Sequence, residues 1–209
     1  MSAAAPVLPA LPPLFDTVGT AVFALTGALA AARLRQTFVT VCFFAFVTGV
    51  GGGTVRDLVI GAPPFWLHNH GIAIAVLAVS MLAWFTPPRW WKGQMLEWAD
   101  AAGLAVFAVL GTVKALAFGA PPLSAMILGI VTGCVGGIIR DVLAGVPSIL
   151  MRPELYVTAA ALAAGLAALG LWLGLPRDLV FAIAGMGGFA LRGAALIWRI
   201  ELPAYSHKE

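Results

Sequence analysis

The stretch VTGVGGGTVRDLVIGAP, residues 47–63, places an arginine, an aspartate and a run of glycines inside an otherwise apolar segment. A second version of the pattern, VTGCVGGIIRDVLAGVP, occupies residues 131–147, at a constant offset of 84 residues. Nine of the seventeen positions are identical, among them two consecutive glycines and the Arg-Asp dipeptide. The motif therefore marks equivalent places in two related halves of the chain.

The composition places both halves in a membrane. Hydrophobic residues make up 61% of the 209 residues, charged residues only 10%, and the mean hydropathy is +0.99. A chain with so little polar surface cannot cover a soluble globule. The Lys and Arg residues do not cluster, so the net charge of +3 indicates membrane topology rather than nucleic-acid binding.

Stretches of about 20 predominantly apolar residues between turn signals predict an all-α integral membrane protein with seven transmembrane helices. The whole chain, residues 1–209, forms a single transmembrane domain in this interpretation. The predicted spans are residues 13–33, 38–60, 70–87, 96–117, 122–145, 154–175 and 178–199.

The 84-residue register extends beyond the motif, because DTVGTAVFALTG at 16–27 aligns with DAAGLAVFAVLG at 100–111. Each repeat therefore contains three spans, at about 14–87 and 98–175, and an extra helix follows at about 178–199. A repeat with an odd number of spans enters the membrane from opposite sides each time. The two repeats are therefore predicted to be inverted, related by a pseudo-twofold axis in the membrane plane.

The basic residues predict that the N-terminus lies outside and the C-terminus in the cytoplasm. Arg177 is the chief basic residue on the predicted outer side. The basic residues on the predicted inner side are Arg33, Arg35, Arg89, Lys92, Arg152, Arg199 and Lys208.

Helical spacing divides each motif into two neighbouring stripes, because positions four apart stack on one face. The first stripe holds a threonine, a glycine and the arginine: Thr48, Gly52 and Arg56, with their equivalents Thr132, Gly136 and Arg140. The second holds two glycines and the aspartate: Gly49, Gly53 and Asp57, with Gly133, Gly137 and Asp141.

The glycines have two interpretations, which we weigh equally. Glycines four apart let helices approach closely, whereas a glycine pair also permits a kink whose freed carbonyls can line a water-filled path. We expect both, with the second and fifth spans bent or unwound at Gly52-Gly53 and at Gly136-Gly137.

Arg56 and Arg140 either snorkel to the membrane surface or pair with a carboxylate. A charge in the middle of a span costs about 2.5–3.5 kcal/mol on insertion scales, and two such charges at equivalent places favour pairing. Adjacent helical positions diverge, so we expect the partners to be Asp16 and Asp100 rather than the aspartate that follows each arginine. Those two carboxylates also have a plain interpretation as first-turn acids that interact with a helix dipole. The lone Lys114 is interpreted as a snorkelling anchor.

These repeated motifs resemble those of a known family of membrane proteins. Two three-span units, each with a GG-x-x-RD block in its second helix, and a seventh span resemble the prokaryotic branch of the trimeric intracellular cation (TRIC) channel family. The resemblance implies a homotrimer in the plasma membrane whose subunits each pass monovalent cations such as potassium between spans 2 and 5. It implies pore-lining or gating roles for Thr48, Gly52, Gly53, Arg56, Thr132, Gly136, Gly137 and Arg140. The residues themselves, apart from the resemblance, lead us to expect supporting ion pairs from Asp16, Asp57, Asp100 and Asp141.

A rival interpretation keeps the fold and changes the activity to secondary transport of a small amino acid such as glycine, since inverted repeats are common in carriers. A scaffold or lipid-binding subunit gives no reason for paired intramembrane charges. The sequence holds no nucleophile-base pair, metal-ligand cluster or phosphate-binding loop, so we expect no enzyme, cofactor or bound metal. The expected partners are monovalent cations and membrane lipids.

Overall fold

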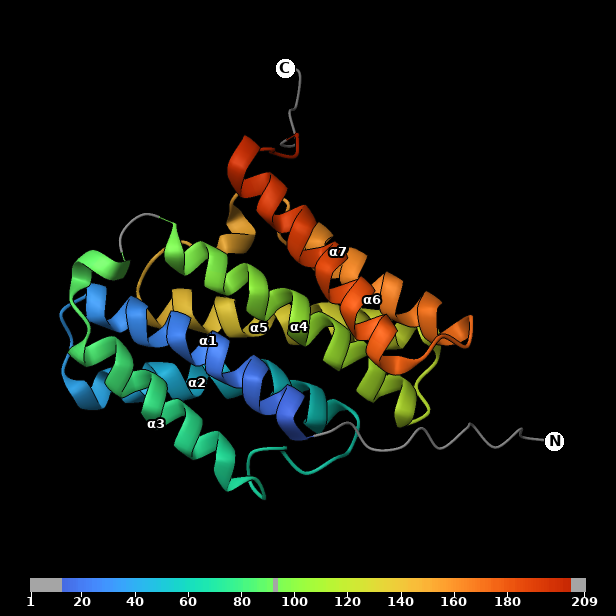
Figure 1. The fold of residues 1–209 in the computed structure, drawn as a ribbon, viewed down its shortest axis with the longest axis horizontal. Helices are drawn as coiled ribbons and strands as arrows, with labels where there is room; N and C mark the ends of the chain where they lie inside the picture. The colour runs from blue at the N-terminus through green and yellow to red at the C-terminus, as the bar shows by residue number, and fades with distance from the viewer. Residues whose placement is uncertain (1–12, 92–93, 204–209) are drawn as a thin grey trace, which may run out of the picture.

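The computed structural model describes residues 13–91 and 94–203, and within these residues the chain forms seven α-helices and two short 3-10 helices (Figure 1). Each predicted span coincides with one helix, so the all-helical architecture is confirmed. The helices are α1 (Pro13–Arg33), α2 (Phe38–Val59), α3 (His70–Phe85), η1 (Pro88–Trp91), α4 (Met95–Ala117), α5 (Pro122–Leu143), η2 (Ile149–Met151), α6 (Val157–Trp172) and α7 (Arg177–Trp198).

Helices α1, α2, α4, α5 and α7 are long and apolar enough to cross a membrane by length and composition. Helices α3 and α6 have only 16 residues each, so the predicted spans 70–87 and 154–175 are too long. Helix α3 stops because Thr86 precedes a proline and has an extended backbone, with ψ of 140°. Helix α6 starts late because Glu154 pairs its backbone with Glu201, beyond the end of α7.

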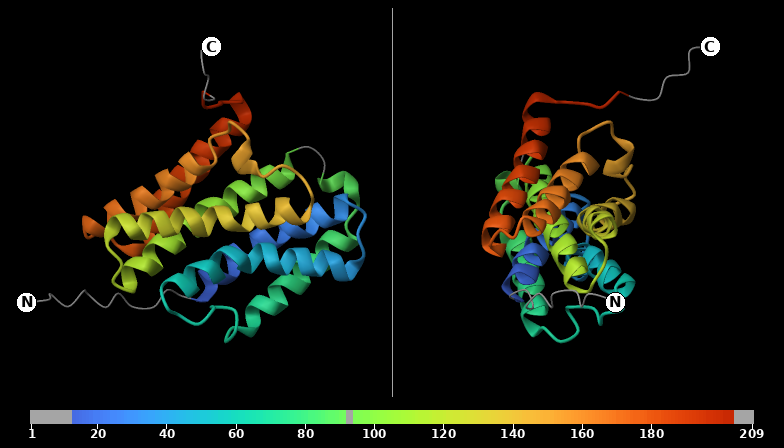
Figure 2. Two further views of the ribbon diagram at one scale, coloured as in Figure 1. Left: turned by 180° about the vertical axis from the view of Figure 1, so that it is seen from behind. Right: turned by 90° about the vertical axis from the view of Figure 1, so that its right-hand side faces the viewer.

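The helices pack in equivalent pairs. Helix α1 contacts α2 and α3, and helix α4 contacts α5 and α6 in the same way. The two sets meet through contacts of α1 with α4 and of α2 with α5, and α7 packs on α4 and α6 (Figures 1 and 2). The order of contacts therefore follows the repeat in the sequence.

The outer surface of the bundle is apolar, as a lipid-facing surface requires. Large side chains such as Val39, Ile74 and Trp172 are exposed on it. The face of α6 that packs into the bundle is instead made of alanines, including Ala159, Ala163 and Ala167, which are fully buried. Small side chains let neighbouring helices approach closely where no hydrophobic effect drives them together.

Helices α2 and α5 run as continuous α-helices through Gly52-Gly53 and Gly136-Gly137, so the predicted unwinding is wrong. The glycines serve close packing instead. A Cβ atom on Gly52 would overlap the carbonyl oxygen of Thr132, and one on Gly136 would lie 2.8 Å from the carbonyl oxygen of Thr48. The two contacts are equivalent to each other, so α2 and α5 meet through the same surface on both helices.

The second stripe packs inside each repeat. A Cβ atom on Gly49 would lie 2.9 Å from the carbonyl oxygen of Thr20 in α1, and one on Gly133 would lie 2.9 Å from that of Leu104 in α4. The two stripes therefore hold α2 and α5 against different neighbours. No helix unwinding is needed to explain these glycines.

We expect Gly52→Ala to destabilise the protein, because the added methyl group would overlap a helical carbonyl group that cannot move aside without shifting α5. Overpacking of this kind costs on the order of 1–3 kcal/mol. Gly185→Ala is the matched control, since Gly185 also lies inside a helix and nothing lies within 4 Å of the added carbon. Thermal unfolding in detergent should give a lower Tm for Gly52→Ala than for Gly185→Ala. Equal values would contradict the close contact.

Candidate functional site

The first of two equivalent ion clusters lies at the C-terminal end of α2. Arg56 is fully buried, and its Nη1 atom lies 3.3 Å from Asp16 Oδ1 at the start of α1. Its Nε atom donates to Asp57 Oδ1 at 2.8 Å. Lys114, from the last turn of α4, places Nζ 2.8 Å from the same oxygen of Asp57. Two basic and two acidic side chains therefore neutralise one another here, and we call them the outer cluster, after the side of the membrane that the basic residues of the sequence predict for it.

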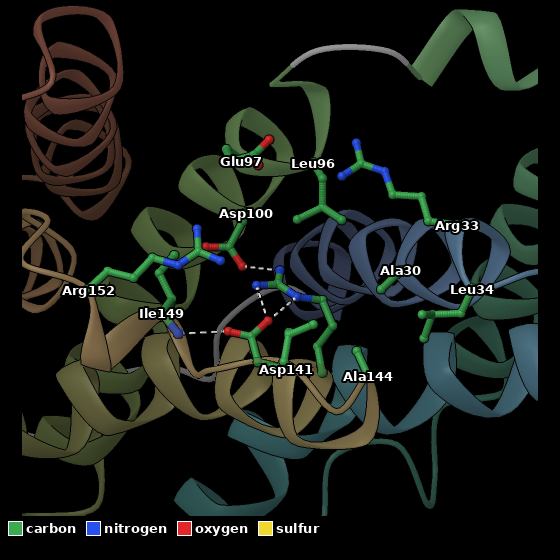
Figure 3. Close-up of a pocket in the computed structure, with 12 residues that line it drawn as sticks. Ala30, Arg33, Leu34, Leu96, Glu97, Asp100, Asp141, Ala144, Ile149 and Arg152 are labelled. Carbon is green, nitrogen blue, oxygen red and sulfur yellow. Dashed lines mark hydrogen bonds and ion pairs between the residues drawn. The ribbon is translucent and has the colours of Figure 1, made fainter.

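The inner cluster lies at the C-terminal end of α5 (Figure 3). Arg140 places Nη1 2.5 Å from Asp100 Oδ1, and its Nη2 atom lies 2.9 Å from Asp141 Oδ1. The second oxygen of Asp141 accepts the backbone N–H of Ile149 at 2.8 Å. Arg140, Asp100 and Asp141 are all buried. Charge-assisted hydrogen bonds offset much of the cost of removing such groups from water.

The expectation that an arginine cannot meet the aspartate that follows it is wrong. Arg56 binds Asp57 and Arg140 binds Asp141 through Nε. Adjacent Cβ atoms diverge on a helix, but an arginine side chain is long enough to curl around the helix toward its neighbour. The loop after each helix also fixes the carboxylate, since Asp57 Oδ2 accepts the backbone N–H of Phe65 at 2.8 Å.

Asp16 and Asp100 lie beside the arginines that the sequence assigned to them. The alternative role as a first-turn acid applies to Asp16, which lies in the first turn of α1. It does not apply to Asp100, because α4 begins at Met95 and its first-turn acid is Glu97. The pairing with Arg140 is therefore what explains a buried carboxylate at position 100.

The interpretation of Lys114 as a lone snorkelling anchor is wrong, because Lys114 pairs with Asp57. Its side chain is only 19% exposed. The offset of 84 residues makes Ala30 its equivalent in the first repeat, so this pairing has no counterpart in the inner cluster.

The threonines of the first stripe lie between the two clusters, inside the contact of α2 with α5. Thr48 and Thr132 are fully buried, and each presents its backbone carbonyl oxygen to a glycine of the opposite helix. Their Oγ1 atoms lie against glycines of the first helix of the same repeat, Gly27 for Thr48 and Gly111 for Thr132. Thr132 Oγ1 donates to the carbonyl oxygen of Leu128 at 2.6 Å, whereas Thr48 Oγ1 has no hydrogen-bond partner among the described residues. Between the two ion clusters, the contact of α2 with α5 is therefore made by glycines and backbone carbonyl groups, with the threonine hydroxyl groups on its α1 and α4 sides.

Arg192 in α7 belongs to a third buried group that the sequence analysis missed. Its Nη2 atom donates to Glu154 Oε2 at 2.5 Å, and its guanidinium lies 5.3 Å from the ring centroid of Tyr156. The signal for this group in the sequence is the presence of an arginine inside the predicted span 178–199. This group ties α7 to the loop that precedes α6, close to the inner cluster.

The fold and the buried charge clusters define a multi-pass helical membrane protein of the channel or transporter class. The family model described as "Glycine transporter" matches residues 13–88 and again residues 97–172. The chain belongs to this family, which is related to the prokaryotic TRIC channels.

Relatives and solved structures agree with this assignment. The chain is 37% identical to the "UPF0126 inner membrane protein YadS" of Escherichia coli K12, over 93% of this chain and 96% of the relative. It is 38% identical to a "UPF0126 membrane protein" of Vibrio cholerae, over 92% of this chain and 82% of the relative. The TRIC channel orthologue of Rhodobacter sphaeroides superposes with a TM-score of 0.82 at 38% identity, over 90% of this chain and 97% of that one.

A second solved structure, of a TRIC cation channel, also gives a TM-score of 0.82. Its identity to this chain is 27%, and the match covers 94% of this chain and 98% of that one.

We expect Asp100→Asn to destabilise the protein more than Asp16→Asn. Asp100 is 1% exposed, and its loss leaves Arg140 undercompensated in a buried place at a cost of roughly 3–5 kcal/mol. The side chain of Asp16 is 13% exposed and its contact with Arg56 is longer, so we expect a loss on the order of 1 kcal/mol. Unfolding in mixed micelles measures both. An equal or reversed order would contradict the assigned burial of the inner pair.

Proposed function

We propose that this protein is a potassium-permeable monovalent cation channel, with one pore in each subunit of a homotrimer. The observation that carries the proposal is the contact of α2 with α5 through glycines and backbone carbonyl groups, with a buried ion cluster at each side of the bundle. Buried arginines in a membrane protein are costly, and at two equivalent places they indicate an ion or substrate path. The similarity to solved TRIC channels supports the same function.

In this proposal Thr48, Arg56, Thr132 and Arg140 line the path, and the glycine pairs set how closely α2 and α5 approach. Asp16, Asp57, Asp100 and Asp141 neutralise the arginines and restrict the two mouths. The described conformation is closed in the middle, because each glycine of the first stripe contacts a carbonyl group of the opposite helix. Opening requires α2 and α5 to separate along this contact.

A second candidate is a carrier for a small amino acid such as glycine. The description of the matching family model favours it, and the fold accommodates either activity. A carrier would open the path to one side of the membrane at a time, at one cluster or the other. A channel would open the path at both clusters at once. The path between α2 and α5 is the same in both cases.

We place the protein in a prokaryotic plasma membrane with the N-terminus outside and the C-terminus in the cytoplasm. Arg33 and Arg152 both line the cavity beside the inner cluster, which supports an inner side rich in basic residues. Lys92 and Lys208, which contributed to the predicted orientation, lie outside the described residues. A fluorescent protein fused to the C-terminus should fold and fluoresce in the cytoplasm, and loss of fluorescence in abundant, correctly inserted protein would reverse the orientation.

Purified protein in liposomes separates the two candidates. We expect potassium efflux that is driven by a gradient, carries charge and does not saturate at low millimolar concentration, because a channel does not undergo a full conformational cycle for each ion. Labelled glycine is assayed in the same vesicles. Saturable glycine counterflow without an accompanying potassium current would favour the carrier, and protein-free liposomes provide the baseline.

A further inference from the structure

An aromatic side chain covers the second glycine of each glycine pair. A Cβ atom on Gly53 would overlap the ring of Phe65, and one on Gly137 would lie 2.6 Å from the hydroxyl oxygen of Tyr156. The two aromatic residues are not equivalent in the repeat, because the offset of 84 residues makes Ile149 the equivalent of Phe65. Tyr156 is therefore a feature of the second half alone.

The hydroxyl group of Tyr156 lies beside the carboxylate of Asp100. The Cβ position of Gly137, 2.6 Å from the hydroxyl oxygen, is also 3.2 Å from Asp100 Oδ1. Tyr156 is 1% exposed, and neither its hydroxyl oxygen nor Asp100 Oδ2 has a hydrogen-bond partner among the described residues. A buried polar group without a partner is costly. Here a buried donor and a buried acceptor lie next to each other, so a small rotation of either side chain satisfies both.

The ring of Tyr156 faces the buried Arg192 of α7. The guanidinium carbon lies 5.3 Å from the ring centroid, and Arg192 is 1% exposed. Its Nη2 atom binds Glu154, whereas its Nε and Nη1 atoms have no hydrogen-bond partner in the described part of the chain. A cation over an aromatic face is attracted to it, and more strongly when both are out of water. Tyr156 therefore contacts α7 with its ring and the inner cluster with its hydroxyl group.

The loop that carries Tyr156 is also fastened to the segment after α7. Glu154 forms an antiparallel backbone bridge with Glu201. The backbone N–H of Leu202 donates to the carbonyl oxygen of Pro153 at 2.6 Å. A movement of α7 relative to the repeats would therefore move this loop, and Tyr156 with it.

We propose that Tyr156 is a positioning residue of the inner cluster, which couples α7 to the carboxylate that neutralises Arg140. Its hydroxyl group donates to Asp100 Oδ2, so that Oδ1 of the same carboxylate stays turned toward Arg140. Phe65, the ring at the equivalent glycine of the first half, has no hydroxyl group for this purpose. The consequence for transport rests on the proposed function, in which Asp100 restricts the inner mouth and α7 thereby acts on it.

Tyr156→Phe removes the hydroxyl group and keeps the ring that Arg192 faces. We expect it to lower the Tm of the purified full chain in detergent by about 5 °C, because Asp100 Oδ2 is then buried without a donor. Thr158→Val is the matched control, since Thr158 Oγ1 is also buried and has no hydrogen-bond partner among the described residues. Its Tm should stay close to the wild-type value.

A spectroscopic measurement tests the positioning separately from stability. The chain has two tyrosines, Tyr156 and Tyr205, so fluorine NMR of protein labelled with 3-fluorotyrosine gives two resonances, which Tyr205→Phe assigns. Asp100→Asn should shift the Tyr156 resonance, because the hydroxyl group loses a charged acceptor. Asp141→Asn removes a carboxylate of the same cluster that is bound to the backbone of Ile149 instead, and should shift the resonance much less.

Arg192→Gln tests the link to α7, and should also shift the Tyr156 resonance because the guanidinium group leaves the ring face. No shift in this variant would remove the coupling to α7. Equal Tm values for Tyr156→Phe and Thr158→Val, or a Tyr156 resonance that ignores Asp100→Asn, would overturn the proposal. If Asp100→Asn does not yield monodisperse protein, the comparison of the two Tm values decides alone. Absence of potassium flux in liposomes would remove the proposed channel and leave the role of Tyr156 standing.

Discussion

The structure depends on the neutralisation of two arginines that the membrane cannot otherwise hold. Arg56 and Arg140 are buried at equivalent ends of α2 and α5, and each is bound by two carboxylates. One carboxylate comes from the same helix and the other from the first helix of the same repeat. These pairs join the first two helices within each repeat. The contact of α2 with α5 is made by glycines and backbone carbonyl groups, and the ion pair of Lys114 with Asp57 links α4 to α2 between the repeats.

The contacts inside a repeat and the contacts between α2 and α5 differ in how costly they are to separate. Contacts inside a repeat are charge-assisted hydrogen bonds, which are strong in a low-dielectric interior. Contacts between α2 and α5 are close van der Waals contacts at Gly52 and Gly136, which can be separated without exposing an unpaired charge. In the proposed mechanism α2 and α5 separate along this contact, and the movement has to accommodate the ion pair of Lys114 with Asp57, which also joins the two repeats.

Much of this arrangement could be predicted from the sequence, because the repeat is a strong constraint. Apolar stretches between turn signals located all seven helices, and the offset of 84 residues placed Asp16 and Asp100 beside the correct arginines. The family resemblance rests on the same doubled motif, and the comparisons confirm it.

The remaining features depend on the shape of the packed chain. Helix spacing describes Cβ directions and could not show that Arg56 curls back to Asp57. Glycine pairs permit a kink or a close contact, and only the neighbouring backbone decides between them. The pairing of Lys114 required the knowledge that the end of α4 lies beside the end of α2. The shorter α3 and α6 depend on a local proline and on a backbone bridge to Glu201.

The central claim is that cations cross each subunit between α2 and α5. The most direct measurement is the unitary potassium current of the Thr48→Val/Thr132→Val protein in planar bilayers, since valine keeps the shape of threonine and removes its hydroxyl group. Ser80→Ala, which removes a buried hydroxyl group from α3, is the control. The account predicts a lower unitary conductance for the double variant and a wild-type value for Ser80→Ala. An unchanged conductance in the double variant would place the path elsewhere, such as on the axis between subunits.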